Sequence, residues 1–77
     1  MSGRSLLKAF AVEVRRARTE MALSQEELGA RAGLHRNYIG MIERGERSPT
    51  LAAIDGIARG MKMKASELIA RAESRSA

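Results

Sequence analysis

The segment GLHRNYIGMIERG, residues 33–45, places polar and cationic side chains on one side of a predicted helix. Ile39 and Ile42 lie three residues apart and define an inward stripe at the 3.6-residue period. The residues pointing away from that stripe are Asn37, Gly40, Met41 and Arg44, with Arg36 on its flank. This outward face has two arginines and an asparagine but no carboxylate. Because a guanidinium group donates paired hydrogen bonds to a phosphate or a guanine edge, the face predicts an anionic partner.

The composition favours the same kind of partner. Fourteen Lys and Arg stand against nine Asp and Glu, giving a formal charge of +5, and eleven of the fourteen are Arg. Such an excess favours nucleic acid first and an anionic membrane surface second. The chain has no cysteine, which excludes disulfides and thiolate metal sites and fits a reducing cytoplasm. No apolar run approaches the length of a membrane span, and no signal peptide is recognisable.

The elements that must position these side chains are predicted to be helices. One proline, few aromatic residues and abundant Ala, Leu, Arg and Glu indicate a single small all-α domain over residues 1–77. We expect five helices, at about 5–21, 24–33, 36–44, from Thr50 to about 61, and 65–73. Ser48, followed by Pro49, is the alternative cap of the fourth. Residues 74–77 are expected to be frayed.

Local signals support both ends of the second helix. The sequence SQEE is a capping box in which Ser24 caps the helix and Glu27 reaches back to the cap amide. Gly33 is expected to end this helix in the left-handed conformation. Gly29 in its interior costs about 1 kcal/mol relative to Ala, which predicts a close helix–helix approach. In the fourth helix, Leu51 is assigned to the buried face together with Ile54, Ile57, Ala58 and Met61.

Two short helices separated by AGLH form a helix-turn-helix pattern, here in residues 24–44. The segment LSQEELGARAGLHRNYIGMIERGERSPTL resembles the Cro/repressor (Xre-type) helix-turn-helix family, which shares the pattern S-Q-x-x-L-A-x-x-A-G-L…I-x-x-I-E-x-G-x-x-x-P. More narrowly, HRNYIGMIERGERSPT is similar to restriction–modification controller proteins, which carry R-x-Y-I-S-x-I-E-R. The resemblance implies a compact five-helix lambda-repressor-like domain. In such domains the second helix crosses the DNA backbone and the third enters the major groove.

By this resemblance, the start and outer side of the third helix are expected to contact bases. Arg36 can donate to N7 and O6 of guanine, and Asn37 can pair with adenine or bond a phosphate. Met41 can touch a thymine methyl group. Gly40 departs from the family pattern, and it either lets the helix sit deeper or only lowers helix stability. The expected base contacts are therefore Arg36, Asn37, His35, Gly40 and Met41, with a plain helix cap as the alternative for His35.

The expected backbone contacts are Gln25, Tyr38, Arg44 and Arg47. Gln25 matches a family position that bonds phosphate at a helix N-terminus. Tyr38 can hold a phosphate or instead cover the core, and Arg47 can instead reach a groove edge. Glu43 falls close to the apolar stripe and needs a partner when partly buried. The family has a structural pair at this glutamate, and Arg18 occupies the matching arginine position.

No combination of titratable residues resembles a general acid–base site, so we expect no enzyme activity, no catalytic residue and no cofactor. One histidine, one aspartate and no cysteine cannot make a credible metal site. Regulators of this kind bind two half-sites about 34 Å apart as two-fold dimers. The last two helices, about 50–73, are expected to form the dimer contact. Its residues would be Met63, Leu68, Ile69 and Ala72, unless these only close the monomer core.

These observations predict a sequence-specific, double-stranded DNA-binding transcriptional regulator that binds a palindromic operator as a homodimer. A restriction–modification controller is the narrower interpretation. We expect a cytoplasmic protein associated with the nucleoid, with no membrane contact and no small-molecule effector. One rival is an antitoxin that binds a toxin and its own operator. A second is a non-specific basic or membrane-surface domain, but the chain lacks the aromatic anchors this would need.

Overall fold

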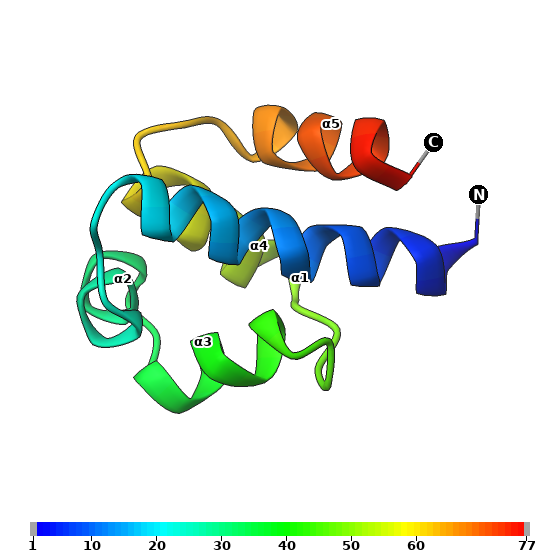
Figure 1. The fold of residues 1–77 in the computed structure, drawn as a ribbon. Helices are drawn as coiled ribbons and strands as arrows, with labels where there is room; N and C mark the ends of the chain where they lie inside the picture. Colours follow the sequence, from blue (N-terminus) through cyan, green and yellow to red (C-terminus); the bar gives the residue numbers. More distant parts are fainter. Residues whose placement is uncertain (1, 77) are drawn as a thin grey trace.

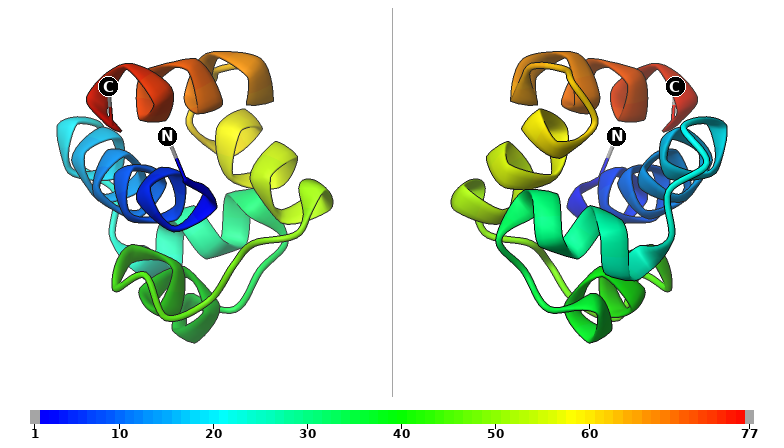
Figure 2. Two further views of the ribbon diagram at one scale, coloured as in Figure 1. Left: turned by 90° about the vertical axis from the view of Figure 1, so that its right-hand side faces the viewer. Right: turned by 90° about the vertical axis from the view of Figure 1, so that its left-hand side faces the viewer.

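The computed structural model describes residues 2–76, and helices dominate this range. The helices are α1 (Gly3–Glu20), α2 (Gln25–Ala32), α3 (Arg36–Glu43), α4 (Leu51–Gly60) and α5 (Ala65–Ser76). The predicted all-α fold with five helices is confirmed, and residues 2–76 contain no strand. In Figure 1, α1 lies between α5 on one side and α3 on the opposite side, and Figure 2 shows α4 across the molecule from α1. None of the described helices is both long and apolar enough to cross a membrane.

Side-chain caps fix where the helices begin. The predicted capping box is present, since Ser24 Oγ accepts from the Glu27 amide at 2.9 Å and Glu27 Oε1 accepts from the Ser24 amide at 2.9 Å. The capping hydrogen bond lowers the pKa of the Glu27 carboxyl. Thr50, rather than Ser48, caps α4 by accepting from the Ala53 amide at 3.1 Å. α1 begins at Gly3, two residues before the predicted start, because Ser2 caps it.

The prediction of a frayed C-terminus is wrong for Ser74 to Ser76, which continue α5; Ala77 lies outside the described residues. An ion pair explains the extension, because Arg75 Nε donates to Glu13 Oε1 at 3.2 Å and ties the end of α5 to α1. Glu13 also accepts from Arg16 Nη2 at 2.7 Å, and its side chain is only 2% exposed. Burial by itself raises the pKa of Glu13, but the bonds from the two arginines outweigh it and the pKa is lowered.

Apolar residues from all five helices meet in one core. α5 packs along α1, while α2 packs between α3 and α4. The assignment of Leu51 to this core is wrong, because its side chain is 85% exposed. Leu51 is the first residue of α4 and lies beyond the packed part of the helix. The residues that are completely buried include Val14, Leu28, Ile39, Ile42, Ile57 and Leu68.

Gly29 sets the geometry of the turn between α2 and α3. A Cβ atom added at this position would lie 2.5 Å from the Leu34 carbonyl oxygen and 3.3 Å from the Arg36 amide nitrogen. The predicted close approach therefore exists, but it is made by the backbone of the following turn and not by a distant helix. Gly33 has φ of 73° and ends α2 as expected, and the Leu34 amide donates to the Gly29 carbonyl at 2.8 Å.

Candidate nucleic-acid interface

A shallow groove runs along the outward side of α3. It is lined by Gln25, Arg36, Asn37, Gly40, Met41, Arg44 and Glu46. Six of these seven residues were predicted contacts with DNA bases or backbone, and they come together because the first turn of α2 lies against α3. The apolar side of α3 is buried through Ile39 and Ile42, so the groove is the side of the helix that remains open to a partner.

Arg36 and Asn37 are the exposed polar groups at the start of α3. Arg36 is held loosely, because its Nη1 donates to Glu26 Oε2 at 3.3 Å between side chains that are 62% and 75% exposed. Met41 lies half-buried in the same groove. Gly40 is buried beneath its neighbours, since a Cβ added there would lie 3.0 Å from Arg44 Nη1 and 3.5 Å from Gln25 Oε1. Gly40 therefore forms the floor of the groove and not an exposed contact surface.

The outward side of α3 carries no carboxylate of its own, but the loop after α3 brings one into the groove. Glu46 lines the groove and accepts two hydrogen bonds from Arg44. Arg44 Nε donates to Glu46 Oε2 at 2.9 Å, and Arg44 Nη2 donates to Glu46 Oε1 at 3.2 Å. The hydrogen bond from Arg44 lowers the pKa of the Glu46 carboxyl, so this group is charged at neutral pH. The sequence signal for it was available, because the glycine that ends α3 brings the next residue back beside the last helical turn.

A buried network fixes the two helices of the motif relative to α1. Glu43, 2% exposed, accepts from Arg18 Nε at 2.7 Å, from Arg18 Nη2 at 2.9 Å and from Gln25 Nε2 at 3.1 Å. Arg18 Nη1 also donates to the Leu23 carbonyl at 2.8 Å, and the bond to Glu43 raises the pKa of Arg18. The Arg18–Glu43 pair expected from the resemblance is thus present. It also orients Gln25, whose side chain lines the groove.

Three predicted contact residues lie outside the groove. His35 caps α3, since its Nδ1 accepts from the Asn37 amide at 3.0 Å, which is the alternative that the sequence left open. Tyr38 is half-buried and packs against the core. The guanidinium carbon of Arg47 lies 5.7 Å from the centre of the Tyr38 ring, a cation–π contact that holds Arg47 beside α3.

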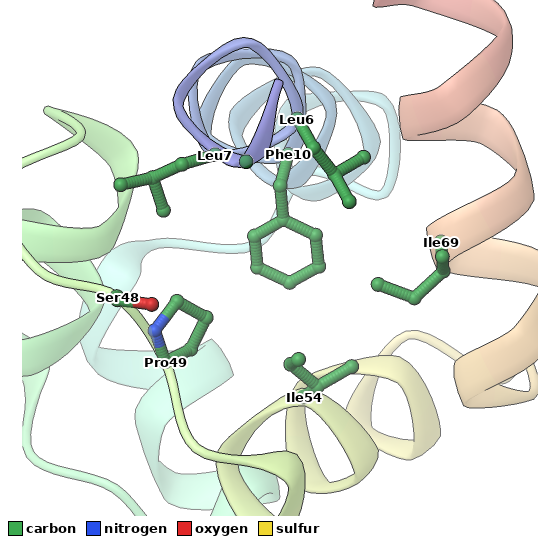
Figure 3. Close-up of a pocket in the computed structure, with 8 residues that line it drawn as sticks. Leu6, Leu7, Phe10, Ser48, Pro49, Ile54 and Ile69 are labelled. Carbon is green, nitrogen blue, oxygen red and sulfur yellow. The ribbon is translucent and has the colours of Figure 1, made fainter. Parts of the chain in front are cut away.

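The predicted dimer residues separate into two groups. Leu68 and Ala72 are completely buried within the single chain, so they close the monomer core and present no surface. Met63 and Ile69 are only partly buried. Ile69 lies at an open apolar pocket of about 130 Å³, together with Leu6, Leu7, Phe10, Pro49 and Ile54 (Figure 3). The exposed Leu51, which the sequence argument missed, lies one helical turn before Ile54.

Within residues 2–76, no three His, Cys, Asp or Glu side chains are grouped so that they could hold a metal ion. The side chains of the groove are instead hydrogen-bond donors, acceptors and one thioether. This set suits contacts with base edges and phosphates.

Comparison with known proteins identifies the family to which the chain belongs. The helix-turn-helix family model matches residues 14–68. The chain is 41% identical over 62 residues to the control protein C.SmaI of Serratia marcescens, covering 80% of this chain and 74% of that protein. It is also similar to the crystal structure of the restriction–modification controller protein C.AhdI from Aeromonas hydrophila. That match has 39% identity and a TM-score of 0.78, and it covers 80% and 94% of the two chains.

A third likeness is to the restriction–modification controller protein C.Esp1396I, solved as a tetramer in complex with its natural 35 base-pair operator. Identity is 25%, the TM-score is 0.84, and 99% and 97% of the two chains are covered. Members of this family are regulators and not enzymes. The chain belongs to the Cro/repressor (Xre-type) helix-turn-helix family and is a DNA-binding transcriptional regulator.

Proposed function

We propose that this protein is a sequence-specific regulator that binds a two-fold symmetric operator as a homodimer and acts as a restriction–modification controller. The observation that carries the proposal is the open outward side of α3, where Arg36 and Asn37 are exposed while Ile39 and Ile42 are buried. A recognition helix packed on both sides by its own fold could not enter a major groove. The likeness to C.SmaI, C.AhdI and C.Esp1396I supports the controller function.

Base recognition is assigned to Arg36 and Asn37. Arg36 must give up its contact with Glu26 to reach a base, and an exposed ion pair of this kind is worth about 0–1 kcal/mol. A paired contact with guanine contributes roughly 1–3 kcal/mol of discrimination. The exchange therefore favours DNA. Gln25, oriented by Glu43 at the start of α2, is assigned to a backbone phosphate.

Dimerisation is assigned to the surface formed by Leu51 and the apolar pocket beside Ile54 and Ile69. Leu51 is 85% exposed, and burying a leucine side chain contributes about 1.5–3 kcal/mol. The pocket is apolar and open, and Ile54, which lines it (Figure 3), lies on the same helix as Leu51. In a two-fold dimer each Leu51 can enter the pocket of the other copy, which satisfies the self-complementarity that such symmetry requires.

The test of recognition begins with selection of bound duplexes from a random pool, which should enrich a palindrome. Arg36→Ala should then lose roughly 1–3 kcal/mol of affinity for the selected duplex and little for a scrambled one. The matched control is Arg71→Ala, which removes the same charge from an exposed position on α5, opposite α3. An equal loss on both duplexes for Arg36→Ala, or no enriched site, would refute sequence-specific recognition by this face.

The test of dimerisation compares Leu51→Lys with Val12→Lys in sedimentation equilibrium. Val12 is another exposed apolar residue, 49% exposed on α1, and it lies away from the apolar pocket. We expect Leu51→Lys to be monomeric and to lose affinity for a palindrome far more than for an isolated half-site. Val12→Lys should remain dimeric. If the Leu51→Lys variant were still dimeric, Leu51 would not be part of the dimer contact.

A further inference from the structure

The Arg44–Glu46 pair places a negative charge inside the groove assigned to DNA, between side chains that are 57% and 54% exposed. Glu46 lines that groove beside Arg36, Asn37 and Met41. Its carboxylate takes both the Nε and Nη2 donors of Arg44, at 2.9 and 3.2 Å. These are the donors that an arginine uses to bind a phosphate with two parallel hydrogen bonds. One edge of the Arg44 guanidinium group is therefore already bound to an anion of its own chain.

The backbone holds Glu46 in this position. α3 ends in a Schellman motif, in which the Glu46 amide donates to the Met41 carbonyl at 2.9 Å and the Gly45 amide donates to the Ile42 carbonyl at 3.0 Å. Gly45 has φ of 71°, the left-handed conformation that this motif requires. Since the Glu46 backbone is tied to the last turn of α3, its carboxylate can leave the groove only by rotating its side chain. It stays near any DNA that α3 approaches.

We propose that Glu46 is a built-in competitor for phosphate that occupies Arg44 and lowers the affinity of this surface for DNA of every sequence. A phosphate that binds Arg44 must displace the carboxylate and then lies close to it. Phosphate contacts supply essentially all of non-specific affinity and much of specific affinity. Glu46 therefore keeps the contribution of Arg44 small, and discrimination depends more on the base contacts at the other end of the groove.

The inference rests on the placement of DNA in this groove, as proposed above. The probe is a random-sequence duplex, so no operator need be known. Glu46→Gln keeps the shape of the side chain and removes its charge. We expect it to bind the random duplex about three- to tenfold more tightly than the unmodified protein. The variant no longer has to break the exposed Arg44–Glu46 ion pair, and it no longer places a carboxylate beside the DNA phosphate. The logarithmic salt dependence should steepen by up to about 0.9 per protomer, because Arg44 can now neutralise a phosphate.

Two further variants separate this effect from a general change of charge. Glu73→Gln makes the same change at an exposed position of α5, on the side opposite α3, and should alter affinity less than about twofold because of screening. Adding Arg44→Ala to Glu46→Gln should abolish both the gain in affinity and the steeper salt dependence. Binding should be measured at protein concentrations at which sedimentation shows that all variants have the same oligomeric state.

Three results would overturn the inference. The first is a Glu46→Gln variant that binds the random duplex no more tightly than the unmodified protein, and the second is a gain equal to that of Glu73→Gln. The third is loss of affinity for a selected operator alone, which would make Glu46 a base contact. Arg36→Ala and Gln25→Ala distinguish these results from failure of the proposed function. If neither changes affinity for any duplex, DNA does not occupy this groove.

Discussion

Replacing Glu43 by glutamine should be among the most damaging conservative substitutions in this protein. The carboxylate is 2% exposed, and its two oxygens accept three hydrogen bonds, two from Arg18 and one from Gln25. A glutamine has one amide oxygen and one NH2 group. In either orientation the NH2 group faces an N–H donor, and the cation of Arg18, only 11% exposed, loses its counter-charge.

Breaking a buried ion pair by removing one partner costs about 3–5 kcal/mol. A domain of this length has roughly 4–12 kcal/mol of total stability, at about 0.05–0.15 kcal/mol per residue. Glu43→Gln should therefore remove a large fraction of the free energy of unfolding. Urea denaturation followed by circular dichroism measures it, with the slope m checked to be unchanged so that the midpoint reports stability alone.

The double variant Arg18→Met with Glu43→Leu keeps the test decisive even if Glu43→Gln does not fold. Apolar side chains of similar size leave no buried charge, and such replacements are often neutral or stabilising. Arg18→Met also removes the bond to the Leu23 carbonyl, which is worth about 1 kcal/mol. We expect the double variant to lie within about 1–2 kcal/mol of the unmodified protein. A loss below about 1 kcal/mol for Glu43→Gln, or a double variant as unstable as the single, would refute the reasoning.

Two more substitutions test the scaffold around the groove. Gly29→Ala should lower the free energy of unfolding by about 1–3 kcal/mol, although alanine favours helices, because its Cβ would lie 2.5 Å from the Leu34 carbonyl oxygen. Gly3→Ala, where nothing lies within 4 Å, is the control and should not destabilise; equal effects at the two sites would contradict the steric argument. The lowered pKa of Glu13 stabilises the folded state above the unfolded pKa near 4.5, and this contribution is lost as pH falls through the lower folded pKa. Glu13→Gln should therefore lower the free energy of unfolding at neutral pH and make that free energy fall less steeply as the pH is lowered. Urea titrations at neutral pH and below pH 4.5 would measure both effects. If the free energy of unfolding fell as steeply in the variant, the Glu13–Arg75 ion pair would not be the source of the acid sensitivity.

Much of the fold follows from the sequence because its signals are local. The capping box of Ser24 and Glu27 involves residues three apart, and such a bond forms wherever the helix forms. The apolar stripe of α3 is also a local signal, because Ile39 and Ile42 are three residues apart and their spacing decides which side of α3 is buried. The cluster of predicted contacts in the groove then follows, since the side of α3 that faces outward is fixed once its apolar side faces the core.

Long-range packing decided what the sequence could not. Leu51 and Leu68 are both leucines in amphipathic helices, yet one is 85% exposed and the other is completely buried. Leu68 is covered because α5 packs against α1 and α4, whereas Leu51 is the first residue of α4 and lies beyond the packed part of that helix. For the same reason, the surface that we propose for dimerisation lies near Leu51 and not at Leu68 and Ala72, which are completely buried.

The charge of the groove shows the division most clearly. A helical wheel assigned the outward side of α3 only cations and an amide, because it considers one helix at a time. The turn after α3 and the first turn of α2 bring Glu46 and Glu26 to the arginines of that side. The sequence determined which side chains α3 offers to a partner. The tertiary structure decided how free Arg36 is to bind that partner, since the packing of α2 against α3 brings the Glu26 carboxylate to its guanidinium group.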